Sequence, residues 1–187
     1  DAAGKSTDTA WLYQKNFKDA AWFRETLAGK FLKSAALDGT HVADAQFDAD
    51  AAKATGTDGL SIGFSAPIRD DAGKVIAVWT NRASFSLVEE TIQSTYAEFK
   101  RRHYGSAEFT LLDRTGRVLV DYDPTRTGST EVKHDPAVVL KLNLAENGVA
   151  AARRAIKGES GVVTSRHARK QIEQVAGYAA SQGALGF

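Results

Sequence analysis

The side chains that most often carry catalysis or bind metals are few in this chain and lie far apart in its sequence. The chain has four histidines and no cysteine. His41, His103, His134 and His167 have no ligand spacing with one another, such as the i, i+4 pair that places two imidazoles on one face of a helix. We see no nucleophile paired with a base, so we expect no catalytic residues, no metal and no cofactor. A small hydrolase is a weaker alternative, which would need a nucleophile–base contact.

The glycine-rich and basic stretches do not indicate phosphate or nucleic-acid binding. "GTDG" and "GESG" do not lie between a strand and a helix, as phosphate-binding loops do, and we interpret them as turns. "RRHYG" and "ARRAIKG" are short basic runs that favour solvated helix faces. The formal net charge is +1, whereas a nucleic-acid binder needs a basic excess. We therefore expect no nucleic-acid partner.

Aromatic and polar side chains could instead form a pocket for a small molecule. Trp22 and Phe23 fall in a helical segment that we expect near the mouth of a sheet. Trp79 and Asn81 are two residues apart on a predicted strand, so they should point to the same face. A tryptophan can wall a small pocket while its indole N–H donates a hydrogen bond. The alternative is that both tryptophans belong to the ordinary core.

The elements that would position these residues begin with a predicted hairpin. Leu60–Ile68 alternates apolar with small or polar residues, which is typical of a half-buried strand. "RDDAG" is typical of a turn in which Gly73 adopts positive φ, and Lys74–Asn81 is the returning strand. A helix should follow from Ser86 to about residue 102, with Val88, Ile92, Tyr96 and Phe99 on its inner face.

The same pattern then occurs a second time. "PIRDDAGKVIAV" and "LLDRTGRVLV" share an Asp-x-x-Gly turn between two apolar strands, and residues 107–113 and 117–123 should form the second hairpin. Asp135–Pro136 should open a helix, a further short helix should end at Gly158, and "GVVTSR" and "QIEQVAGYA" should form a final hairpin. The repeat indicates two successive modules of the α+β class.

The segment before the first hairpin shows less pattern. Tyr13, Phe17, Ala20 and Ala21 have helical spacing, so we expect the first 28 residues to be helical, with an end at Gly29. Residues 31–57 have no sustained period, and we interpret them as a long irregular excursion.

Length and composition fit a globular extracytoplasmic or cytosolic protein. The 187 residues, 43% of them hydrophobic and 25% charged, could form one domain or two small ones. We place a division after residue 92, with domains at 1–92 and 93–187. The chain has no methionine, no signal peptide and no apolar run near the ~18 residues of a membrane span. We expect it to be an excerpt of a longer protein, or a processed one.

Three stretches together resemble a known family. "WFRETLAGK", then a variable loop, then "GFSAPIRDDAGKVIAVWTNRASFSLVEETI", resembles the membrane-distal module of a double Cache domain, the extracytoplasmic sensor of many bacterial methyl-accepting chemotaxis receptors. "AEFTLLDRTGRVLVDYDP", followed by "AIKGESG" and "QVAGYAASQGALGF", resembles the membrane-proximal module. The likeness covers most of the chain from about residue 22, and the order and spacing of the motifs are its specific part.

The resemblance implies two PAS-like modules in series, each an antiparallel sheet flanked by helices, after an N-terminal helix. It implies a periplasmic domain of an inner-membrane receptor that binds a small organic molecule in the distal module and can form a homodimer. The same sensor occurs on histidine kinases and diguanylate cyclases, so the output module stays open. A protein-interaction module of the same fold, with no small-molecule ligand, is a further alternative.

Two positions depart from the amino-acid-sensing branch of that family. The branch has an arginine where this chain has Ala20, and an aspartate where this chain has Arg82. An α-amino acid bound in the family's way is therefore disfavoured. If Arg82 turns inward, it needs an anion, and a ligand carboxylate matches its two-pronged guanidinium. We predict a carboxylate ligand on Arg82, with Asn81 and Trp22 completing the site. The alternative is that Arg82 points to solvent or pairs with an acid such as Glu89 or Glu90.

Overall fold

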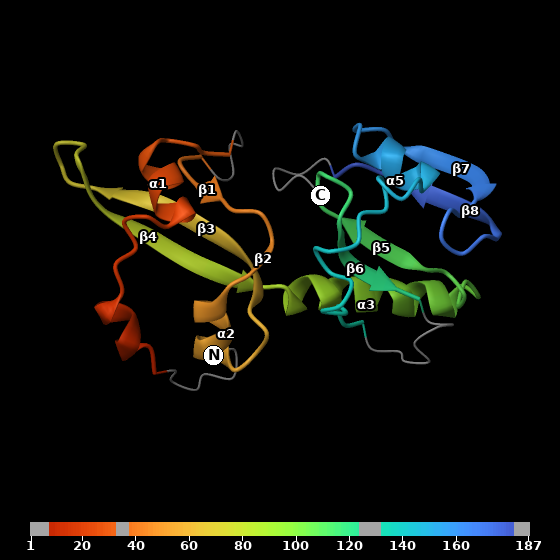
Figure 1. Ribbon diagram of the computed structural model, residues 1–187, viewed down its shortest axis with the longest axis horizontal. Helices are drawn as coiled ribbons and strands as arrows, with labels where there is room; N and C mark the ends of the chain where they lie inside the picture. Colours follow the sequence, from red (N-terminus) through yellow and green to blue (C-terminus); the bar gives the residue numbers. More distant parts are fainter. Residues whose placement is uncertain (1–7, 33–37, 124–131, 182–187) are drawn as a thin grey trace. The chain divides into compact units, whose positions relative to one another are not determined.

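The computed structural model describes residues 8–32, 38–123 and 132–181, and the chain divides into two units, Asp1–Phe85 and Ser86–Phe187 (Figure 1). Both units combine antiparallel strands with a few helices, which confirms a mixed α and β fold. Helix α3 (Ser86–Arg101) is the first element of the second unit, and the division predicted after residue 92 falls inside this helix.

The first unit contains a four-stranded sheet centred on β3 (Leu60–Arg69). On one edge, β1 (His41–Val42) and β2 (Gln46–Phe47) each pair with a different part of β3. On the other edge, β4 (Val75–Ser84) pairs with β3 along nearly its whole length. The two predicted strands are therefore confirmed, and each continues slightly beyond the end that the sequence pattern indicated.

The N-terminal segment departs from the predicted helix over the first 28 residues. Within the described part, it forms a 3₁₀ helix, η1 (Ala10–Gln14), and a short α-helix, α1 (Ala21–Leu27). Lys15 already has an extended backbone, and the Asn16 side chain accepts the N–H of Lys18. Such a local side-chain bond offers the backbone an alternative to helical hydrogen bonds. Tyr13, one of the residues with helical spacing, is 91% exposed.

The described residues between 38 and 57 were predicted to be irregular, and this was wrong. They contain β1, β2 and the helix α2 (Ala49–Thr55). Asp48 caps α2 because its Oδ1 accepts the N–H groups of Asp50 and Ala51, at 2.9 and 3.0 Å. Gly56 ends the helix in the left-handed conformation. The helix is short and rich in alanine, so it produced no apolar period.

Among its described residues, the second unit contains two hairpins and one further helix besides α3. Strands β5 (Phe109–Leu112) and β6 (Val118–Tyr122) form one hairpin, and β7 (Gly161–Arg166) and β8 (Glu173–Tyr178) form the other. The short helix α5 (Ala150–Ala155) precedes β7. These hairpins and this helix lie where the sequence predicted them.

The core of the second unit gathers around β6 and the inner face of α3. Val118, Leu119 and Val120 are almost fully buried, and Val118 packs with Leu144, Ala145 and Ala152. The four residues predicted on the inner face of α3 are buried or half-buried. Tyr96 of α3 meets the Tyr122 ring edge-on at 4.8 Å.

The helix predicted to open at Asp135–Pro136 does not form. Residues 136–141 form turns, and Leu140 has a φ of +59°. The Leu140 N–H donates to the Val118 carbonyl, and the Val118 N–H donates to the Leu142 carbonyl, each at 2.8 Å. This segment therefore pairs with the start of β6, and a continuing helix would lose these bonds.

The two sequence repeats fold into the same turn. Asp70 Oδ1 accepts the N–H groups of Ala72 and Lys74, and Asp113 Oδ1 accepts those of Thr115 and Arg117, two and four residues further on. In both turns the glycine has positive φ and donates its N–H to the aspartate carbonyl. A register shift precedes each turn, after Ile68 and after Leu111. The predicted correspondence between the hairpins therefore extends to individual hydrogen bonds.

No helix among the described residues is both long enough and apolar enough to span a membrane.

Candidate functional site

Strand β4 separates the predicted site residues onto two faces. Trp79 and Asn81 share one face, as predicted, and both are exposed, Trp79 at 64%. Arg82 lies on the opposite face with Thr80, because side chains alternate along a strand. The structure therefore does not bring the Asn81 side chain together with Arg82. Asn81 contributes its backbone carbonyl, which accepts a hydrogen bond from Arg82 Nη1 at 3.1 Å.

Arg82 turns inward, and its side chain is only 20% exposed. Gly63 is its register partner on β3, and a Cβ there would lie 3.3 Å from Arg82 Nη1, so the glycine leaves room for the guanidinium. Arg82 Nη1 donates to Thr80 Oγ1 at 2.7 Å, and Nε donates to Asp48 Oδ2 at 2.6 Å. Arg82 therefore does not point to solvent, and the acid that pairs with it is Asp48, not Glu89 or Glu90.

Trp22 and Phe23 of α1 complete this cluster. The Arg82 guanidinium carbon lies 5.6 Å from the centre of the Trp22 ring, within the range of a cation–π contact. Trp22 also packs against Phe17 and meets Phe23 edge-on, with ring centres 5.6 and 5.7 Å apart. The structure therefore brings together Trp22, Phe23 and Arg82 of the predicted set.

Asp48 is the residue of this cluster that the sequence analysis missed. Its side chain is 14% exposed; one oxygen caps α2 and the other accepts from Arg82. Burial raises the pKa of Asp48, but the hydrogen bonds from Arg82 and from the Ala51 and Asp50 N–H groups outweigh it, so this pKa lies below its ordinary value of 3.8. An aspartate at the start of an alanine-rich segment ending in glycine was the available signal.

The cluster can bind an anion only in competition with Asp48. The guanidinium carries one positive charge, and the carboxylate already neutralises it at short range. A small carboxylate would have to replace Asp48 Oδ2 on Arg82 Nε while stacking near Trp22. The assignment of the five predicted residues to a ligand site stays a prediction.

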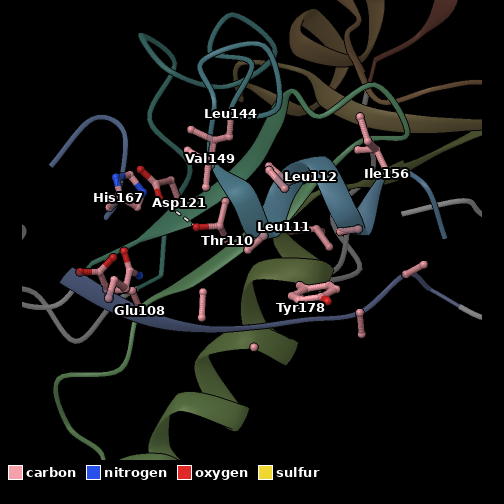
Figure 2. Close-up of a pocket in the computed structure, with 18 of the residues that line it drawn as sticks. Glu108, Thr110, Leu111, Leu112, Asp121, Leu144, Val149, Ile156, His167 and Tyr178 are labelled. Carbon is pink, nitrogen blue, oxygen red and sulfur yellow. Dashed lines mark hydrogen bonds between the residues drawn. The ribbon is translucent and has the colours of Figure 1, made fainter. Parts of the chain in front are cut away.

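The second unit contains an open cavity of about 680 Å³ that the sequence analysis did not predict. It lies between β5, β8 and α5 (Figure 2). Figure 2 shows Glu108, Asp121 and His167 toward one end, and Leu112, Ile156 and Tyr178 toward the other. Thr110 Oγ1 donates to Asp121 Oδ1 at 3.1 Å. The cavity therefore has a polar end and an apolar end.

Lys170 connects the charged groups near the polar end. Its Nζ donates to Asp123 Oδ2 at 2.8 Å and lies 2.6 Å from Glu108 Oε2. Burial lowers the pKa of Lys170, but its bonds with Asp123 and Glu108 outweigh burial and raise it above the ordinary value. This ammonium therefore remains charged beside its two carboxylates.

His167 is held in its neutral form. Its Nδ1 faces the backbone N–H groups of Arg169 and Lys170, at 3.2 and 3.1 Å, and therefore acts as an acceptor. Burial, followed by the charges of Lys170 and Arg169, lowers the pKa of His167. The ring proton consequently belongs on Nε2, where it is available for donation.

Within the ranges 8–32, 38–123 and 132–181, no three His, Cys, Asp or Glu side chains are arranged to hold a metal ion. No protein-family model, curated protein or solved structure matches this chain.

Proposed function

We propose that this chain is a ligand-binding sensor domain of the double Cache type, with two PAS-like modules in series. The observation that carries the proposal is the repeated hairpin, whose two turns share the same hydrogen bonds in two successive units. Duplication of a turn at this level of detail supports two modules of one design. We further propose that the chain is the periplasmic part of an inner-membrane chemotaxis receptor and is not an enzyme.

The ligand is proposed to bind in the first unit, at the cluster of Trp22, Arg82 and Asp48. A partly buried arginine beside an aromatic ring suits a small organic carboxylate, since the guanidinium donates parallel hydrogen bonds and the ring supplies apolar contact. Binding would displace Asp48 from Arg82. Because Asp48 also caps α2, occupancy would bias the unit between two arrangements, which is a population shift that a receptor can transmit.

A thermal-shift screen of small carboxylates, read by tryptophan fluorescence, is the first experiment. All three tryptophans, Trp11, Trp22 and Trp79, belong to the first unit. A ligand at about 100 times its dissociation constant stabilises a fold by roughly 2.7 kcal/mol, which is readily detected.

Two variants then test the competition by titration calorimetry. Arg82→Ala should weaken a carboxylate hit by roughly ten- to a hundredfold, because a charge-assisted hydrogen bond is removed. Asp48→Asn should strengthen binding, because it removes the competing carboxylate. Asn81→Ala, on the opposite face of β4, is the matched control and should leave affinity unchanged. Unchanged affinity in both Arg82→Ala and Asp48→Asn would rule out this site.

A second function, a protein-interaction module with no small-molecule ligand, is favoured by one observation. Arg82 is already neutralised by Asp48 and covered by Trp22, whereas Trp79 is exposed on β4. A homodimer or receptor partner would then use the exposed face. Analytical ultracentrifugation of the chain and of Trp79→Ser distinguishes the two functions: dimerisation lost on substitution, together with no carboxylate hit, favours interaction. The same sensor on a histidine kinase or diguanylate cyclase remains the alternative for the output.

A further inference from the structure

The ring of His41 is buried where β1 packs against α1, and its side chain is 8% exposed. Its Nδ1 atom lies 3.0 Å from the backbone carbonyl oxygen of Lys30. A carbonyl oxygen can only accept a hydrogen bond, so Nδ1 must carry a proton and donate it. This bond therefore assigns the role of one ring nitrogen, whether the ring is neutral or charged.

The second ring nitrogen, Nε2, is buried and has no hydrogen-bond partner among the described residues. The charged atom nearest to it is Oε2 of Glu25, in α1, at 3.4 Å. In a neutral ring with its proton on Nδ1, Nε2 has only a lone pair, so two acceptors face each other. A buried acceptor left in this way is costly. A second proton, on Nε2, changes the contact into an attraction between an imidazolium and a carboxylate.

The groups around the ring can accommodate this positive charge. Lys30 Nζ lies 3.2 Å from Glu25 Oε1, so the carboxylate has one oxygen for each of two cations. Lys30 is 64% exposed, and solvent screens its repulsion of the ring. On β3, the register partner of His41 is the uncharged Ser65, whose hydroxyl shares a hydrogen bond with that of Thr80. Within the described residues, Glu25 and Lys30 are thus the charged groups that face the ring.

Helix α1 depends on contacts of this kind. It has seven residues, and no side chain caps its first turn. Isolated helices of this length are marginal in water, so α1 must be held by packing. Thr26 anchors it at 1% exposure, and Trp22 of the same helix lies over Arg82. The contact between Glu25 and His41 therefore connects the position of this helix to the charge of one histidine.

We propose that His41 is a pH-sensitive contact that holds helix α1 on the sheet of the first unit. With a proton on both nitrogens, the ring binds the Lys30 carbonyl and the Glu25 carboxylate. Loss of the Nε2 proton removes the second contact and weakens the attachment of α1, and of Trp22 with it. Acid therefore closes the first unit over Arg82, and neutral pH loosens it. This inference goes beyond the proposed function and does not depend on a ligand at Arg82.

Nitrogen NMR of the chain labelled at its histidine side chains tests the protonation states directly. Below about pH 5.5, we expect both nitrogens of His41 to be protonated. Above about pH 9, we expect Nδ1 to keep its proton and Nε2 to have none, which is the opposite of the tautomer inferred for His167. His41→Gln identifies the signals of this ring by their loss.

Urea unfolding followed by tryptophan fluorescence measures the effect on stability. His41 is the only histidine in the sequence of Asp1–Phe85, and all three tryptophans lie there as well. Histidine is the side chain that ordinarily titrates between about pH 5.5 and 8. The ion pair is lost as the pH rises through this range, so we expect the folding equilibrium constant of the first unit to fall at least about tenfold. The α1 amides should also exchange faster, after correction for the intrinsic rates.

Glu25→Gln is the decisive variant, because a glutamine amide can donate to the neutral Nε2 and cannot pair with an imidazolium. The fall in stability between about pH 5.5 and 8 should disappear in this variant. Asp71→Asn, which removes an exposed carboxylate of the same unit, is the matched control and should show the same fall as the unchanged chain.

Three results would overturn the inference. The neutral ring could hold its proton on Nε2, the stability of the first unit could stay constant or rise between about pH 5.5 and 8, or the fall could persist in Glu25→Gln. If His41→Gln does not fold, the other two measurements still decide, because neither of them changes His41.

Discussion

Removing the Asp48 carboxylate should destabilise the first unit more than any surface charge does. The side chain has two separate tasks, because Oδ1 caps α2 and Oδ2 accepts from Arg82 Nε at 2.6 Å. Losing a cap costs about 0.5–2 kcal/mol, and losing a charge-assisted hydrogen bond costs about 1.5–3 kcal/mol. Since both groups are less than a quarter exposed, solvent screens the pair weakly. We expect Asp48→Ala to lower the free energy of unfolding by about 3 kcal/mol.

Asp48→Asn separates the two tasks. Its one carbonyl oxygen can cap α2 or accept from Arg82, but it cannot do both with the geometry of a carboxylate. We expect a loss of about 2 kcal/mol, most of it from the ion pair. The matched control is Asp50→Asn, which removes the exposed pair of Asp50 with Lys15. Exposed pairs contribute about 0.2–1 kcal/mol, so this variant should remain close to the unchanged chain.

Urea unfolding followed by tryptophan fluorescence measures these losses in the first unit alone, since all three tryptophans lie there. With a slope near 1 kcal/mol per molar urea for a small unit, 2 kcal/mol lowers the midpoint by roughly 2 M. A midpoint for Asp48→Asn within about 0.3 M of that for Asp50→Asn would refute the reasoning, because the Arg82 pair would then contribute no more than a surface pair.

The remaining predictions concern pH and the repeated turns. The pKa values of Asp48 and Asp113 lie below the ordinary value of 3.8. The stability that these two ionised carboxylates contribute is therefore present above pH 3.8 and is lost as the pH falls through their folded-state pKa values. Urea midpoints should decline below about pH 4. Asp113→Ala should lower the free energy of unfolding by about 2–4 kcal/mol, because the buried Asp113 carboxylate accepts several hydrogen bonds. The equivalent Asp70→Ala, at an exposed turn, should lower it by about 1 kcal/mol or less. Unfolding followed by circular dichroism measures both losses. Gly73→Ala should lower the free energy of unfolding by about 1 kcal/mol, from its φ of +82° alone. Gly116→Ala should lower it by about 3 kcal/mol, because the new Cβ would lie 2.6 Å from the Cβ of Ala145. Equal melting points for the two variants would contradict this.

The sequence predicted well those elements whose signals are local. Strands β3 and β4, the turn at Gly73 and helix α3 follow from alternation, turn residues and a helical stripe, all of which depend on neighbouring residues. The helix predicted at Asp135–Pro136 does not form because the N–H groups of Leu140 and Leu144 donate to the carbonyls of Val118 and Gly116, whereas the other N–H groups of residues 138–142 bond within turns. Nothing in an Asp-Pro pair indicates that a distant strand will compete for the backbone.

The same contrast between local signals and contacts of distant residues applies to the candidate site. That Arg82 and Trp22 lie together could be predicted, from the family resemblance and from the need of an inward-turning guanidinium for a partner. Its partner Asp48 could not, because this contact joins residues 34 positions apart and depends on how β2 and α2 place the carboxylate. The cavity of the second unit could not be predicted either, because it depends on β5 and β8 lying apart in the folded chain.

All strand pairings of the described residues connect positions that are close along the chain. The most distant registered partners are His41 with Ser65 in the first unit, and Arg117 with Asn143 in the second. Folding rate falls as the average sequence separation of contacting residues grows, because closing long loops costs entropy before any contact compensates. Each unit should therefore fold rapidly. The described sheet of the first unit is complete at Ser84, so it can form as soon as the chain up to Phe85 is free to fold.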